Sequence, residues 1–274
     1  MSKGNLKYIL AIIALAAILV AGALYADKVY VPPEPPPNII YTIKGPVILY
    51  EEAEPGDLVT APNLGTIYYL NNQSQRVVFP DEQTFLTWYP DYDDVKTIPR
   101  ELLESFPLSG RNVTIRPGTL LITIPSSYQV WMISYPNDIH WLKGGESQVI
   151  DLFGENWTER LVDLQEYYFD NYHDDYAIEN FQIYPVGLLI HAASNDQYYL
   201  TVDHGQRMIT AEGLTANRFQ TKYAIERDEP LDLDVTGPPI DGYEPRWGSP
   251  DMREQAQDPG PQHYDIGDGE VEVG

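Results

Sequence analysis

The sequence predicts an α+β fold: two to three tandem modules of short antiparallel strands with short helices, after an N-terminal transmembrane helix. Two observations predict it, an uncharged apolar stretch near the N-terminus and a turn phrase that occurs three times. The phrase reads EPGDLV at 54–59, IRPGTLL at 115–121 and YPVGLLI at 184–190. A repeat of about 65 residues is long for a solenoid, so each copy is expected to form a small module packed beside the next.

The N-terminal region is predicted to be a cytoplasmic stub, residues 1–7, followed by a transmembrane helix or signal anchor at 8–26. The second segment carries no charged side chain and has the length that spans a bilayer, about 20 apolar residues. Lys3 and Lys7 precede it, which favours a cytoplasmic N-terminus. The alternative is a signal peptide cleaved near the AGA sequence at 21–23, which would make the protein secreted. Both alternatives place the bulk of the chain outside the cytoplasm.

A proline-rich stalk is predicted at 27–38. The run VPPEPPPN excludes helix and sheet and favours an extended, stiff polyproline segment. Such a segment would hold the folded part away from the membrane. The alternative is a ligand for a proline-binding domain.

The folded part is predicted to comprise repeat module 1 at 39–110, repeat module 2 at 111–180 and a truncated repeat module 3 at 181–226. After each turn phrase come an apolar run, an aromatic-rich run, a polar turn and another apolar run. This order is typical of a three-stranded antiparallel meander. The first two modules continue into helical portions at 81–108 and 145–172, and the third has a shorter one.

The C-terminal region, residues 227–274, is predicted to be an acidic disordered tail. It is rich in proline, glycine and acidic side chains. A segment of this composition buries too little apolar surface to fold by itself.

Three stretches of module 2 carry a resemblance to a known kind of module. VTIRPGTLL, YQVWMI and IHWLKGGESQVIDLFGENWTERLVDLQEYYFDNY resemble a tandem α+β repeat module of exported, surface-associated, largely uncharacterised bacterial proteins. The likeness is clearest over 111–176, continues over 54–110 and is weakest over 184–225. Module 1 departs from it, because YPDYDDV stands where module 2 has the Gly-Asx-Trp pattern. The resemblance implies a location outside the cytoplasm and a modular build, and it implies no catalytic residue.

Composition and motifs exclude several classes of function. The net charge is -24, which argues against nucleic acid as a partner because binding phosphates requires clustered Lys and Arg. The chain has no cysteine, so thiol catalysis and disulfides are excluded. Nucleophile-elbow, zinc-protease and phosphate-loop motifs are absent from the sequence. We therefore expect no enzyme, although an exported carbohydrate-active enzyme remains an alternative because its paired carboxylates have no fixed spacing.

Clustered acids in two loops are candidate calcium ligands. Calcium takes six to eight oxygen ligands, often from carboxylates in flexible loops. The other interpretation is a solvated acidic surface near helix ends. The candidates are Asp91, Asp93, Asp94, Asp170, Asp174 and Asp175. No other cofactor is expected.

Aromatic side chains at matching positions of the repeat are candidate binding platforms. Exposed Tyr and Trp rings make good contact surfaces for sugars and proteins. The alternative is that repeated rings form the core of each module. The candidates are Tyr69, Trp131, Trp141 and Tyr199.

Together these features predict a membrane-anchored extracytoplasmic repeat protein with a structural, adhesion or envelope-binding role. Its expected partners are the membrane, through the N-terminal helix, and a glycan or protein of the cell envelope. Two alternatives stay open: an exported carbohydrate-active enzyme or glycan-binding subunit, and an accessory subunit of a membrane complex.

Overall fold

The computed structural model describes residues 52–124, 129–174, 177–178 and 184–252. The predicted stub, membrane helix and stalk, residues 1–38, lie outside the described residues. Among the residues that are described, no helix is long and apolar enough to cross a membrane. The chain divides into two compact units, Met1–Leu49 and Tyr50–Gly274. All of the described residues belong to the second unit.

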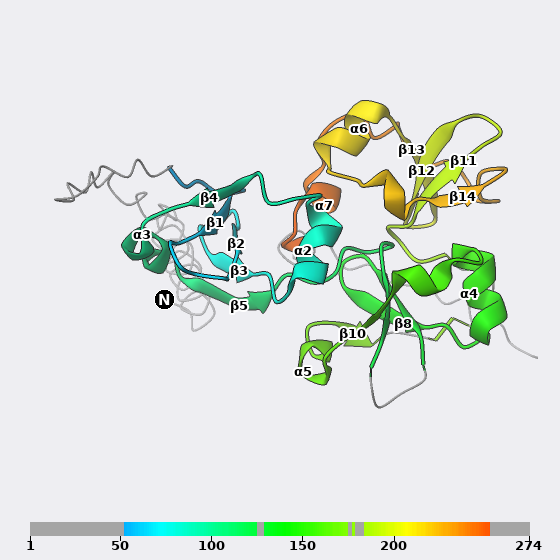
Figure 1. Ribbon diagram of the computed structural model, residues 1–274. Coiled ribbons are helices and arrows are strands. Elements are labelled where there is room, and N and C mark those ends of the chain that lie inside the picture. The colour runs from blue at the N-terminus through cyan, green and yellow to red at the C-terminus, as the bar shows by residue number, and fades with distance from the viewer. Residues whose placement is uncertain (1–51, 125–128, 175–176, 179–183, 253–274) are drawn as a thin grey trace, which may run out of the picture. The chain divides into compact units, whose positions relative to one another are not determined.

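The described residues form three small sheets, and the first has the strand order β4-β1-β2-β3-β5 (Figure 1). Its central strands form an antiparallel meander: β1 Leu58–Thr60, β2 Tyr68–Leu70 and β3 Arg76–Val78. Its outer strands are parallel to their neighbours: β4 Val95–Thr97 lies beside β1, and β5 Leu108–Asn112 lies beside β3. Two helices connect them, α2 Glu82–Trp88 and α3 Arg100–Ser105.

The second sheet repeats this plan with the order β10-β8-β7-β6-β9. Its meander comprises β6 Leu121–Thr123, β7 Trp131–Ser134 and β8 Asp138–Trp141. The parallel outer strands are β9 Leu161–Asp163 beside β6 and β10 His173–Asp174 beside β8. The helical segments are α4 Gly145–Phe153, η1 Trp157–Arg160 and α5 Glu166–Phe169.

The third sheet has the order β13-β12-β11-β14. Its meander is β11 Leu189–Ala192, β12 Gln197–Val202 and β13 Gly205–Ile209, and β14 Ile225–Arg227 lies parallel to β11. The helical segments are α6 Ala211–Ala216, η2 Thr221–Tyr223 and α7 Pro245–Gly248. Where the other sheets have a fifth strand, parallel bridges join β13 to Val235 and Ile240.

The mixed α+β class with small sheets and short helices is thus confirmed, and the antiparallel prediction needs a correction. It holds for the three meander strands of each sheet, whereas each strand added beside a meander is parallel to its neighbour. A parallel neighbour requires a crossover connection, which the helical portion supplies. These added strands are two to five residues long, so they carry little strand signal.

The repeated turn phrase places a glycine with positive φ just before the first strand of each sheet. Its backbone N–H donates to a carbonyl at the last or next-to-last residue of the second strand. The three bonds are Gly56 to Leu70 at 2.7 Å, Gly118 to Ile133 at 3.1 Å and Gly187 to Thr201 at 2.9 Å. Glycine is needed because other residues rarely adopt this backbone conformation. At Gly118 a Cβ would also lie 2.3 Å from the carbonyl oxygen of Gly187.

The prediction of a disordered tail is wrong for residues 227–252. Four apolar side chains of this segment are buried: Leu231, Ile240, Trp247 and Met252. Met252 packs into the core of the first sheet, whereas Ile240 and Trp247 pack into that of the third. The segment folds because each apolar residue packs into a core formed with residues outside the segment. Composition alone measures only whether a segment can build its own core.

Two module boundaries also change. Module 3 is not truncated at 226, because its sheet is continued by bridges at Val235 and Ile240. Module 1 extends past 110, because β5 runs to Asn112. Residues 253–274 lie outside the described residues.

Candidate functional site

Arg116, in the second copy of the turn phrase, joins all three modules. Only 3% of this residue is exposed. Its guanidinium donates to the backbone carbonyls of Arg218 at 2.8 Å, Asn217 at 2.9 Å and Trp247 at 2.8 Å. It also lies over the rings of Trp88 and Phe219, at 4.9 and 3.9 Å. Burial, with a smaller effect of the charge on Arg218, lowers the pKa of Arg116 to about 9. The side chain therefore stays charged at neutral pH and serves as a structural cross-link.

Two other polar side chains connect modules in the same way. Arg160 donates to the carbonyls of Tyr223 and Ala224, both at 3.0 Å, so η1 is tied to η2 and the residue after it. Asp251 is buried, and its Oδ2 accepts from Arg111 at 2.9 Å and from Asn71 at 3.1 Å. The end of the third module is thereby fixed to the first. These charges are satisfied within the fold and are not placed to contact a ligand.

The acidic calcium candidates do not come together among the described residues. Asp91, Asp93 and Asp94 lie in one exposed turn between α2 and β4, and Asp170 is exposed directly after α5. In the described part of the chain, no group of three or more acidic or histidine side chains could hold a metal ion. The Asp174 side chain and Asp175 lie outside what the structure describes. Calcium binding stays a prediction.

Three of the four aromatic candidates belong to cores, so the prediction of exposed platforms is wrong for them. Tyr69, Trp131 and Tyr199 are 5%, 5% and 8% exposed. Trp141 is half-buried at the edge of the second core. Side chains alternate between the two faces of a strand, but the sequence of such a short strand does not show which face is buried. The packing of each module decides whether a ring lies in the core or faces solvent.

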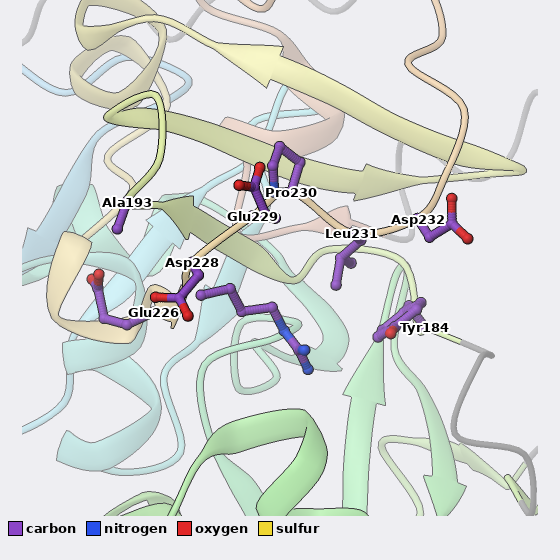
Figure 2. A pocket seen from close by; sticks show the side chains of 9 residues that line it. Tyr184, Ala193, Glu226, Asp228, Glu229, Pro230, Leu231 and Asp232 are labelled. Atoms are coloured by element: carbon purple, nitrogen blue, oxygen red, sulfur yellow. The ribbon is translucent and has the colours of Figure 1, made fainter.

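One open cavity in the described part of the chain lies along β14 and the residues that come after it. We call it the β14 groove. Its volume is about 690 Å³, and its lining is Tyr184, Ala193, Glu226, Arg227, Asp228, Glu229, Pro230, Leu231 and Asp232 (Figure 2). Four lining residues are carboxylates and one is a guanidinium. The groove is therefore strongly anionic, because like charges in a concave surface reinforce one another.

Hydrogen bonds to the β11–β12 turn hold the backbone of the groove in place. The N–H of Ala193 donates to the carbonyl of Arg227, and that of Ser194 donates to the carbonyl of Asp228, both at 2.8 Å. The Ser194 hydroxyl donates to the carboxylate of Glu229 at 2.9 Å. Most of the groove lining comes from the sequence run ERDEPLDLD. Its dense acidic residues could have indicated a binding site. The prediction that residues 227–274 form a disordered tail concealed this possibility.

His191 adjoins the groove through Glu226. Its Nδ1 lies 2.7 Å from Glu226 Oε2, its Nε2 lies 3.0 Å from Asp196 Oδ1, and its ring stacks on Tyr198 at 4.5 Å. Both ring nitrogens can donate to these carboxylates only when the imidazole is protonated. The hydrogen bond with Glu226, followed by that with Asp196, raises the pKa of His191.

We expect His191 to stabilise the fold more in acid than in base. Its folded pKa is raised, so its contribution is fully present below the unfolded value of about 6.5 and is lost as pH rises through the folded pKa. Urea unfolding of the wild type and His191→Gln should differ most below that window and converge above it. An NMR titration should give a pKa above that of a free histidine. A gap between the two proteins that widens with pH would contradict the assignment.

Known proteins offer few matches to this chain. No protein-family model matches it, and no curated protein matches it. Among solved structures, the chain is similar to one in the "periplasmic assembly from the ESX-5 inner membrane complex", with 10% identity and a TM-score of 0.18, over 70% of this chain and 64% of that one. It is also similar to a chain of "an intact ESX-5 inner membrane complex", with 11% identity and a TM-score of 0.18, over 89% and 63%.

This chain therefore spans less than two thirds of the length of either matched chain. TM-scores of 0.18 do not show a shared fold. We accordingly infer function from the residues of the chain itself.

Proposed function

We propose that this protein is a membrane-anchored, extracytoplasmic binding subunit without catalytic activity, and that it engages a basic partner protein of the cell envelope through the β14 groove. The uncharged N-terminal segment at 8–26 and the proline-rich run after it support the anchored, extracytoplasmic placement. The role is that of an accessory or structural component of an envelope assembly.

The observation that carries the proposal is the charge of the groove. Glu226, Asp228, Glu229 and Asp232 line one open cavity, on a chain whose net charge is -24. One nitrogen of the Arg227 guanidinium donates to the backbone carbonyl of Asp151 in α4, and its charge offsets one of the four carboxylates. A surface of this sign attracts Lys and Arg side chains and accelerates their association.

Rigidity of the scaffold supports a binding role. Arg116, Arg160 and Asp251 hold modules together from buried or half-buried positions. The groove itself is fixed by hydrogen bonds from Ala193 and Ser194. A preorganised surface loses little conformational entropy on binding, so more of the interaction energy appears as affinity.

Zero-length cross-linking in intact cells tests the proposal. A water-soluble carbodiimide joins a carboxylate to a lysine amine only when the two are in contact. Full-length protein in its own membrane should give an adduct with a second protein. Mass spectrometry should map the link to carboxylates within 226–232 and to lysines of the partner. The yield should fall when ionic strength is raised before the reagent is added, because salt screens exposed charges. Links that map only to other acidic regions would refute the proposed site.

A further inference from the structure

A second cavity lies between the start of α2 and the segment formed by β9 and α5. We call it the α2–α5 cavity. Its volume is about 310 Å³, at the lower end of the range of small-molecule pockets, roughly 300–1,000 Å³. Ile115 and Leu164, both buried, contribute apolar surface to it. It shares no lining residue with the β14 groove, so a ligand bound in this cavity is independent of the partner proposed for that groove.

A pair of tyrosines forms one side of the cavity. The rings of Tyr167 and Tyr168 lie 4.2 Å apart between centroids. The Tyr168 hydroxyl donates to the carbonyl of Pro80 at 3.3 Å, which fixes the pair to the opposite wall. Burial, followed by the hydrogen bond with Tyr167, raises the pKa of Tyr168. Tyr167 itself is 68% exposed. Its ring therefore faces solvent, while the neighbouring Tyr168 is held in place by its hydrogen bond.

Tyr167 breaks the repeat. When Phe106 of module 1 is aligned with Tyr172 of module 2, both of which are buried after a short helix, Tyr167 corresponds to Glu101, which is exposed. The ring therefore contributes nothing that the module's core requires. A large exposed aromatic side chain that lines a cavity offers a ligand a flat apolar face.

The polar lining decides the class of ligand. Asp81, Glu82 and Asp163 supply carboxylates, and Gln83 and Gln165 supply amides. Carboxylates accept from hydroxyl groups, and amides both donate to and accept from them. An exposed ring packs against the apolar C–H face of a sugar, as it does against other apolar surfaces. We propose that the α2–α5 cavity binds a neutral oligosaccharide, with Tyr167 as the platform for one sugar ring.

An organic cation is the competing ligand, since carboxylates and rings both attract positive charge. Its binding would leave the exposed amides of Gln83 and Gln165 hydrogen-bonded to water, with no part in recognising the ligand. A neutral sugar uses the acceptors, the donors and the ring together. The observations therefore favour the sugar.

The test uses full-length protein in a detergent that has no sugar headgroup. It is applied to an array of neutral oligosaccharides built from glucose, N-acetylglucosamine, galactose and mannose, and the best ligand is then titrated calorimetrically. Tyr167→Ala should weaken its binding about tenfold, whereas Tyr167→Phe should bind like the wild type because it keeps the ring. Both variants should unfold at the wild-type urea midpoint, since the side chain is exposed.

Three results would overturn the proposal: no neutral glycan retained on the array, Tyr167→Ala binding as tightly as wild type, or choline binding more tightly than every glycan. A variant of the β14 groove provides the specificity control. Asp228→Asn/Glu229→Gln/Asp232→Asn should keep full glycan affinity. Loss of glycan binding in that variant would also count against an independent sugar site.

Discussion

Replacing Arg116 with alanine is expected to lower the free energy of unfolding by about 3–5 kcal/mol. The change leaves the carbonyls of Asn217, Arg218 and Trp247 without their buried donor. It also removes the cation from between the Trp88 and Phe219 rings. Arg116→Lys should lose most of the same stability, because an ammonium lacks the planar fork that reaches several carbonyls at once. Urea unfolding followed by circular dichroism measures both.

Arg100→Ala is the matched control for this loss. Arg100 lies on α3 with its side chain 55% exposed and pairs with Glu104 at 3.7 Å. Such surface pairs contribute about 0–1 kcal/mol. Equal destabilisation by Arg116→Ala and Arg100→Ala would show that Arg116 does not join the modules.

Trp247→Ala is expected to cost about 3–5 kcal/mol, the range for truncating a buried aromatic side chain. Trp247 is 5% exposed and packs into the third core with Leu189 and Ile240. Its ring also lies 5.4 Å from that of Tyr135, which comes directly after β7 of the second sheet. The loss should therefore appear in the cooperative unfolding of the whole described unit. Thermal and urea unfolding both report it.

Val235→Ala provides the comparison within the same segment. Val235 is 62% exposed, so the substitution should change stability by no more than about 0.5 kcal/mol. A disordered tail would make both substitutions silent. If Trp247→Ala left the free energy of unfolding unchanged, the prediction that residues 227–252 form a disordered tail would be correct after all.

The repeated turn made the sheets predictable. Glycine before an apolar run, three times over, indicated the meander correctly, because the positive φ at Gly56, Gly118 and Gly187 permits few other residues. The outer parallel strands were not predictable in the same way. Strands such as VKT and LVD form because a crossover helix returns them to the sheet, and that is a tertiary effect.

The site was harder to predict than the fold. Aromatic residues are abundant, but Tyr69 and Tyr199 turn inward, whereas Tyr167 faces solvent. Which ring is exposed depends on how the modules pack, and no periodicity in the local sequence indicates this. The acids of the β14 groove are hidden from a compositional argument, because the average over 227–274 is that of a disordered tail. Four buried apolar residues in that range were enough to order 227–252.

The binding role through the β14 groove is tested most directly by two charge-matched variants in the cross-linking experiment. One carries Asp228→Asn/Glu229→Gln/Asp232→Asn, and the other carries Asp91→Asn/Asp93→Asn/Asp94→Asn in the exposed turn before β4, so each loses three carboxylates. The measured quantity is the yield of the adduct with the partner. The proposal predicts a loss of about tenfold in the groove variant and a wild-type yield in the turn variant. Equal loss in both variants, or an undiminished adduct in the groove variant, would contradict it.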